Sequence, residues 1–228
     1  MKTKVIAAFF VFVLLLLISG KTLCSPRFKE KEMNTINQTI VPPKVLLIHG
    51  FTGNGNGAWF PWLKAELESR GYEVFAPDMP NASHPELEEW LSALDPYMEK
   101  LGPNDIIIGH SLGGKAFLHA ILRAHKKIGR TILVAAAIGG RSEKEWKKME
   151  REWKDGDVPA LRKFWNEKIS LEDISQFTEV TAIFSDDDFA VPLCPREFFP
   201  KEWKYEVWHG FGHFLDPVIP KLLEEVNK

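Results

Sequence analysis

Apolar residues along the chain gather in short runs, and the stretches between the runs show the spacing of amphipathic helices. From residue 44 onward, six short and mostly apolar runs predict β-strands that are covered on both faces. The runs are residues 45–49, 72–76, 105–109, 131–137, 180–184 and 205–208. The helix candidates between them are residues 59–70, 85–101, 112–126, 142–175 and the segment from 217. This alternation predicts an α/β fold with a doubly wound, mainly parallel six-stranded sheet between two helical layers.

The connection after the fourth predicted strand is longer than the others. It runs over residues 141–176, about 35 residues, where a loop and one helix would need fewer. Several aromatic residues stand in it among many Lys and Glu: Trp146, Trp153, Phe164 and Trp165. We expect a small helical insertion here. It either packs its aromatic residues on the sheet or forms a small cap over the strand ends.

The first 43 residues precede the predicted domain, which covers residues 44–228. Lys2 and Lys4 lead into an apolar run, and only 16 residues separate Lys4 from Lys21. A membrane-spanning helix needs about 20 residues. Residues 1–25 therefore predict a secretory signal peptide, with an uncleaved membrane anchor as the alternative. We expect a secreted or extracytoplasmic protein, with residues 26–43 as a linker and membrane contact only through the N-terminal segment.

Composition narrows the function classes. The chain of 228 residues suits one domain, with 45% apolar residues and a net charge of −2. No basic stripe is present, so we expect no nucleic-acid partner. Cys24 and Cys194 are too few for a disulfide framework, and a bridge between them requires that Cys24 remains after processing. The histidines lack metal-ligand spacing, so we expect neither a metal nor a cofactor.

Gly109-His110-Ser111-Leu112-Gly113 lies between the third strand candidate and the helix candidate that follows. This G-x-S-x-G pattern between strand and helix is typical of a nucleophile elbow. The tight turn forces Ser111 into a sparsely populated backbone conformation and leaves no room for side chains at Gly109 and Gly113. The helix that starts behind Ser111 favours an anion there. Ser111 is therefore the candidate nucleophile.

A serine nucleophile needs a base and a carboxylate that orients it, and in this fold the acid precedes the histidine in the chain. His213 follows the last strand candidate and is the expected base, with His209 as the rival. Three aspartates follow the fifth strand candidate, and like charges disfavour burying all of them together. Asp188 is preferred because related hydrolases have the form Asp-x-x-Val-Pro in this loop. Asp186 and Asp187 remain alternatives.

An oxyanion hole needs two backbone N–H groups that converge on one point. We expect one from Leu112, which follows the nucleophile, and one from Phe51 in the turn at residues 49–54. That turn could instead be a Gly-rich connection without such a role. Aromatic residues that could wall an apolar acyl pocket, or belong to the core, are Phe51, Trp59, Phe60 and Phe189.

Over residues 44–226 the chain resembles the small α/β-hydrolases related to the retinoblastoma-binding serine hydrolase and bacterial YdeN. The motifs are His49-Gly50-Phe51, Met79-Pro80-Asn81 with Trp90, residues 109–113, residues 188–192 and Gly212-His213-Phe214. The resemblance implies the α/β-hydrolase fold with a compact six-stranded sheet that lacks the superfamily's first two strands. It also implies the triad Ser111, Asp188 and His213, and esterase-like hydrolysis of small substrates.

The Leu-x-Cys-x-Glu motif that binds retinoblastoma-type proteins is absent, and Leu193 to Glu197 has the wrong spacing. We therefore expect no partner of that type. The hypothesis from sequence is a serine hydrolase that cleaves small carboxylic esters through an acyl-enzyme. Two alternatives remain: an amidase, thioesterase or acyltransferase with the same triad, or a non-catalytic binding protein on this fold.

Overall fold

The computed structural model describes residues 41–228, so the predictions for residues 1–25, for Cys24 and for most of the linker lie outside the described part. All six strands are parallel and pair in the order β2-β1-β3-β4-β5-β6, which confirms the predicted sheet. The strands are β1 Lys44–Ile48, β2 Glu73–Phe75, β3 Ile106–His110, β4 Arg130–Val134, β5 Glu179–Ser185 and β6 Lys204–Trp208. Within residues 41–228, no helix combines the length and hydropathy needed to cross a membrane.

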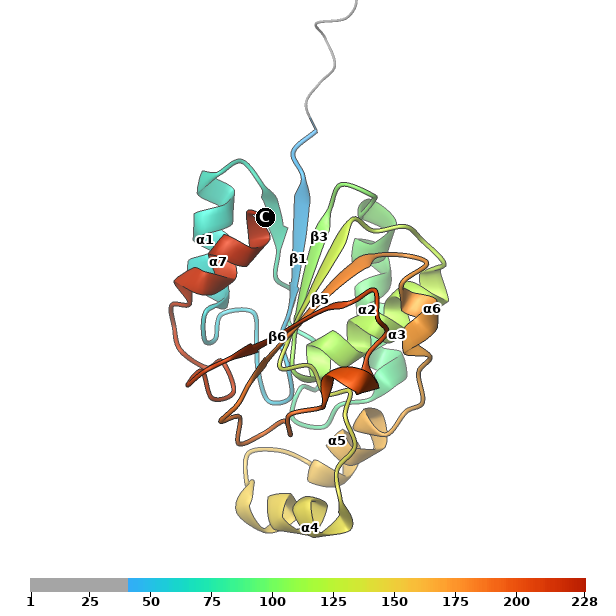
Figure 1. Cartoon of the computed structure of the whole chain (residues 1–228), viewed down its shortest axis with the longest axis vertical. Helices are drawn as coiled ribbons and strands as arrows, with labels where there is room; N and C mark the ends of the chain where they lie inside the picture. Colours follow the sequence, from blue (N-terminus) through green and yellow to red (C-terminus); the bar gives the residue numbers. More distant parts are fainter. Residues whose placement is uncertain (1–40) are drawn as a thin grey trace, which may run out of the picture. The chain divides into compact units, whose positions relative to one another are not determined.

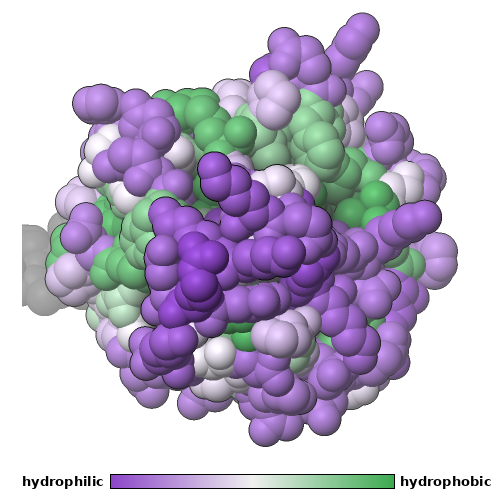
Figure 2. Space-filling model, turned by 90° about the horizontal axis from the view of Figure 1, so that it is seen from below, coloured by the Kyte–Doolittle hydropathy of each residue, from purple (hydrophilic) through white to green (hydrophobic). Residues whose placement is uncertain are grey.

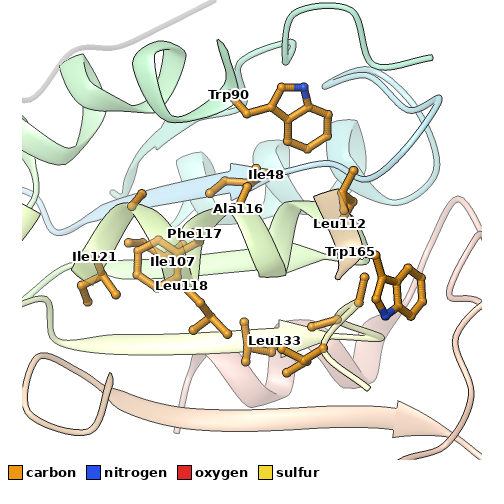
Figure 3. Packing of buried hydrophobic residues seen from close by; sticks show 14 of the residues in the cluster. Ile48, Trp90, Ile107, Leu112, Ala116, Phe117, Leu118, Ile121, Leu133 and Trp165 are labelled. Carbon is orange, nitrogen blue, oxygen red and sulfur yellow. The ribbon is translucent and has the colours of Figure 1, made fainter. Parts of the chain in front are cut away.

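Helices cover both faces of the sheet, as the alternating pattern predicts (Figure 1). On one face lie α1 (Phe60–Ser69) and α7 (Pro220–Val226); on the other lie α2 (Leu87–Lys100), α3 (Leu112–Ala124) and α6 (Leu171–Ile174). Figure 3 shows Phe117 and Leu118 of α3 close to Ile107 and Leu133 of the strands. Burial of these apolar faces fixes the helices on the sheet.

The order of the strands reverses at β1, which has β2 on one side and β3 on the other. In open parallel sheets, ligands bind outside the carboxyl ends of the strands at such a reversal. The turn with Phe51 follows β1, and Ser111 follows β3. The topology therefore brings together two segments that the sequence singles out.

The end of β4 differs from the prediction. The apolar run at residues 131–137 indicates strand throughout, but β4 ends at Val134 and Ala135 has a φ of 47°. The chain then turns beneath the loop after β3. The N–H of Ser111 donates to the carbonyl of Val134 at 2.9 Å, and the N–H of Ala137 donates to the carbonyl of Ser111 at 3.0 Å. Ala137 thus supports Ser111 instead of extending the sheet.

The insertion, residues 141–176, is helical as expected and comprises α4 (Glu143–Glu152), α5 (Val158–Trp165) and α6. A capping box of Ser142 and Glu145 starts α4, and the carboxylate of Asp157 caps α5. Two residues of α4 are buried, Trp146 and Met149. In Figure 1, α4 and α5 lie at the end of the molecule where the strands finish. Figure 2 views this end from below, and its centre is hydrophilic.

Candidate active site

Ser111 lies in a tight turn between β3 and α3, with φ 53° and ψ −123°. Few non-glycine residues adopt a positive φ, and such strain gathers at functional sites. The flanking glycines are required by close backbone contacts. A Cβ on Gly109 would lie 2.6 Å from the Cα of Gly114, and a Cβ on Gly113 would lie 2.3 Å from the carbonyl oxygen of His49. The geometry is that of the predicted elbow.

His213 bridges Ser111 and Asp188. Its Nε2 lies 3.1 Å from the Ser111 Oγ, and its Nδ1 lies 2.9 Å from the Asp188 Oδ2. The Asp188 side chain is 2% exposed, and its Oδ1 accepts the N–H groups of Ala190 and Val191 at 2.7 and 2.8 Å. These bonds hold the carboxylate toward the imidazole. The loops after β3, β5 and β6 thus place His213 within hydrogen-bond distance of both Ser111 and Asp188.

The two neighbouring aspartates are bound elsewhere. The Asp186 Oδ2 lies 2.6 Å from Nδ1 of His209, whose side chain is 94% exposed. Asp187 accepts the N–H of Gly212 at 2.8 Å. Hydrogen bonds to His209 and to Ser185 lower the pKa of Asp186 and of Asp187, respectively. His209 and these two carboxylates therefore form no part of the chain that ends at the Ser111 hydroxyl.

The turn after β1 lies directly beside Ser111. A Cβ on Gly50 would lie 2.7 Å from the Cβ of Ser111, so only glycine allows this approach. The N–H of Phe51 belongs to this turn, and the N–H of Leu112 is the first of α3. Within residues 41–228, neither N–H donates to a protein acceptor. Both donors therefore remain free for a ligand oxygen.

His49 fixes the orientation of that turn. The N–H of Met79 donates to the His49 Nε2 at 2.8 Å, so Nε2 must be an acceptor. The hydrogen of the neutral ring then lies on Nδ1, which donates to the carbonyl of Gly50 at 2.9 Å. Burial lowers the pKa of His49, consistent with a neutral ring. Because a trans peptide points its C=O and N–H in opposite directions, this bond also directs the N–H of Phe51.

His110 performs a similar task for the loop of His213. It is buried, and burial lowers its pKa to about 3. Its Nε2 lies 2.9 Å from the carbonyl oxygen of His213, and because a carbonyl oxygen only accepts, this nitrogen is the donor. The two rings are 4.8 Å apart. A buried neutral imidazole thus fixes the backbone at His213.

A cavity of about 270 Å³, the active-site cavity, opens over Ser111 and His213. Phe51 and Phe60 line it, as two of the expected aromatic walls. The other two lie elsewhere. Trp59 is fully buried and stacks on Phe60 behind the cavity, because its large apolar ring fills the space between α1 and the sheet. Phe189 is 67% exposed and does not line the cavity.

The insertion supplies the wall that sequence analysis did not assign. The side chains it contributes to the active-site cavity are Met149, Trp153, Leu161 and Trp165. Their helical spacing indicates an apolar face, but spacing alone does not tell what that face covers. The active-site cavity therefore has one wall from the sheet loops and one from α4 and α5.

A buried lysine connects the nucleophile helix to the insertion. Lys115 lies one turn after Ser111 on α3 and donates to the carbonyl of Glu167 beyond the end of α5. Its side chain is buried, and burial lowers its pKa to about 8. On the other side, the Arg141 guanidinium donates to the carbonyl of Ala190, in the loop that holds Asp188. Lys115 thus joins the insertion to α3, and Arg141 joins it to the loop after β5.

In the part of the chain that the structure describes, no three His, Cys, Asp or Glu side chains come together as a metal site. His119 lies on α3 near Lys115, and burial lowers its pKa to about 4.

Comparisons with known proteins agree with this fold. The serine hydrolase family matches residues 45–209. The putative hydrolase YdeN of Bacillus subtilis is 33% identical over 178 residues, which are 76% of this chain and 86% of YdeN. The crystal structure of the ydeN gene product superposes with a TM-score of 0.69 at 25% identity, covering 81% of this chain and 97% of that one.

A more distant match shows the fold alone. The ferulic acid complex of Est1E from Butyrivibrio proteoclasticus has a TM-score of 0.60 at 22% identity, and covers 81% of this chain and 86% of Est1E. Together with the parallel sheet, these findings confirm the α/β-hydrolase fold and the resemblance seen in the motifs. The chain belongs to the serine hydrolase family of α/β-hydrolases.

Proposed function

We propose that this hydrolase cleaves small carboxylic esters through a covalent acyl-enzyme formed on Ser111. The observation that carries the proposal is the hydrogen-bonded chain from Asp188 through His213 to the Ser111 Oγ, all of it buried. A serine hydroxyl is a weak nucleophile until an adjacent base removes its proton. This series of hydrogen bonds places a base beside the hydroxyl and a carboxylate that orients the base.

In the first half of the reaction, the Ser111 Oγ attacks the ester carbonyl while the His213 Nε2 takes the hydroxyl proton. Asp188 stabilises the imidazolium that forms. The carbonyl oxygen becomes an oxyanion that accepts the N–H groups of Phe51 and Leu112. His213 then gives its proton to the departing alkoxide, which leaves as the alcohol.

In the second half, water takes the place of the serine. His213 removes a proton from the water as its oxygen attacks the acyl carbonyl, and the same two N–H groups receive the second oxyanion. Collapse breaks the bond to the Ser111 Oγ, and His213 returns the proton to it. The products are the carboxylic acid and the free enzyme.

A fluorophosphonate probe tests the nucleophile directly. We expect S111A to abolish labelling and to lower the rate of ester hydrolysis by roughly 10³-fold or more. S92A, on the exposed side of α2, is the matched control and should label like the unchanged protein. Labelling that persists in S111A would exclude Ser111 as the nucleophile.

A substrate panel tests the bond that is cleaved. p-Nitrophenyl esters, the corresponding anilides and the thioesters of the same acids are compared by kcat/KM. We expect the esters to react fastest. An aryloxide leaves more readily than an anilide nitrogen, which must first take a proton from His213. Faster turnover of the amides or thioesters would replace the ester assignment while keeping the same nucleophile.

A further inference from the structure

A second cavity lies against the active-site cavity, on the other side of two residues of the insertion. This outer cavity has a volume of about 550 Å³ and lies between α4 and the loop that carries Asp188. Met149 and Trp153 line both cavities. We call these two side chains the partition.

The partition is held from several directions. Met149 is buried in the last turn of α4, and its Sδ lies 3.4 Å from the guanidinium of Arg141. Trp153 ends the helix, with its N–H donating to the carbonyl of Met149 at 2.8 Å. Its indole ring lies 5.9 Å from the ring of Phe51, in the turn beside Ser111. The partition thus joins the insertion to the loop that directs the Phe51 N–H.

The two sides of the partition differ in chemistry. Beyond the reacting groups, the active-site cavity has apolar walls that include Leu161, Trp165, Val191 and Leu215. The outer cavity has charged walls: Arg141, Glu145, Lys148, Glu152, Lys154 and Asp155. An apolar chain gains free energy by leaving water on the first side. It gains little on the second, where charged groups retain their water.

We infer that Met149 and Trp153 set the upper size of the acyl group, an inference that rests on the proposed ester hydrolysis. The cavity of about 270 Å³ is less than twice the roughly 150 Å³ that encloses benzene in a protein core. It suits a short aliphatic acyl group or a single ring. A longer chain meets the indole and the thioether before it reaches the outer cavity. The substrate class is therefore esters of short aliphatic or monocyclic carboxylic acids.

The test removes the partition and measures chain-length preference. W153A and M149A are compared with the unchanged protein on p-nitrophenyl esters from acetate to laurate. We expect each variant to raise the ratio of kcat/KM for long to short chains by roughly tenfold or more, because one methylene in an apolar pocket is worth about 10- to 200-fold. K148A is the control, since Lys148 lines only the outer cavity, and its order of preference should not change.

A second series distinguishes the acyl group from the alcohol. Alkyl acetates with a lengthening alcohol should respond much less to W153A and M149A than the acyl series does. An unchanged acyl preference in both variants would overturn the inference, and so would a shift confined to the alkyl acetates. W153F retains a ring and should give a smaller shift than W153A, which keeps the inference testable if W153A does not fold.

Fluorophosphonate labelling separates this inference from the function on which it rests. All rates are divided by the fraction of protein that labels at Ser111. If the unchanged protein does not label, the proposed function fails. If every variant labels normally and the acyl preference stays the same, only the role of the partition fails.

Discussion

Two aspartate–histidine pairs join the loops after β5 and β6, and only one of them reaches a serine. Asp186 and His209 approach to 2.6 Å, and Asp188 and His213 to 2.9 Å. The His209 side chain is 94% exposed, whereas that of His213 is 7% exposed. The same two residue types, a few positions apart, therefore lie in very different surroundings.

The difference shows that burial and orientation determine whether an aspartate–histidine pair can act on a serine. In water an ion pair contributes little, because solvent and salt screen the charges. At the buried site the carboxylate of Asp188 is fixed by two N–H groups and can orient the imidazole and stabilise its charged form. In the exposed pair, Asp186 accepts one backbone N–H, from Gly210 at 3.2 Å, and in the described residues neither member is hydrogen-bonded to a serine hydroxyl.

Substituting the two histidines in turn should give the largest difference in kcat/KM. We expect H213Q to lower kcat/KM for a short p-nitrophenyl ester by roughly 10³-fold or more, since the base is removed. H209Q is the matched change in the exposed pair and should leave kcat/KM nearly unchanged. The measurement is the initial rate of ester hydrolysis, made on variants whose fold has been verified. A large loss in H209Q with little loss in H213Q would reverse the assignment of the base.

The aspartates should show the same contrast at a smaller scale. D188N keeps the shape of the side chain but no longer stabilises the imidazolium, so we expect a loss in kcat of roughly 10²- to 10⁴-fold. D186N should stay close to the unchanged protein. Comparable losses in both variants, measured as kcat at saturating ester, would contradict the separation of the two pairs.

Asp187 lies between the two pairs in the sequence. Substituting it shows how much catalysis depends on the hydrogen bonds that hold the loop of His213. It accepts the Ser185 hydroxyl at 2.6 Å and the Gly212 N–H at 2.8 Å. We expect D187A to lower kcat by about tenfold or less, because a full 1 Å displacement of a reacting group costs on the order of 10²-fold. Steady-state kinetics with fluorophosphonate titration gives the result. A loss as large as that of D188N would place Asp187 in the proton-transfer chain.

The exposed pair should affect only stability, and only slightly. Hydrogen bonding to Asp186 raises the pKa of His209. The stabilisation is therefore fully present below the unfolded pKa of about 6.5 and is lost as the pH rises through the folded pKa. We expect H209Q to have a slightly lower Tm than the unchanged protein at pH 5.5 and the same Tm at pH 9. An equal difference in Tm at both pH values would show that the charge of His209 is not the cause.

The residues that could be predicted from the sequence lie in short segments that carry their own geometric requirement. The glycines around Ser111 indicate a tight turn, and the structure shows that a Cβ at Gly109 or Gly113 would collide with backbone. Strand order then determines which loops meet, so the positions of Asp188 and His213 follow from the topology. Their catalytic roles remain predictions until the variants are measured.

The cavity walls could not be predicted in the same way because they depend on packing between distant segments. Trp59 and Phe60 are adjacent, yet one fills the core and the other lines the active-site cavity. Likewise, the apolar run that ends in Ala135 to Ala137 has no local signal to end the strand. Its turn is stabilised by hydrogen bonds to other segments, including one from Ala137 to Ser111.

The ammonium of Lys115 gives the fold an unusual response to alkali. Its folded pKa of about 8 lies below its ordinary value of 10.5, so between these two pH values the unfolded chain holds a proton that the native protein has lost. Lys115 therefore makes the free energy of unfolding rise with pH across that interval. Burial raises the pKa of Cys194 and of Tyr205, which act in the opposite direction. Alkaline tolerance of the fold thus depends in part on one side chain behind the nucleophile.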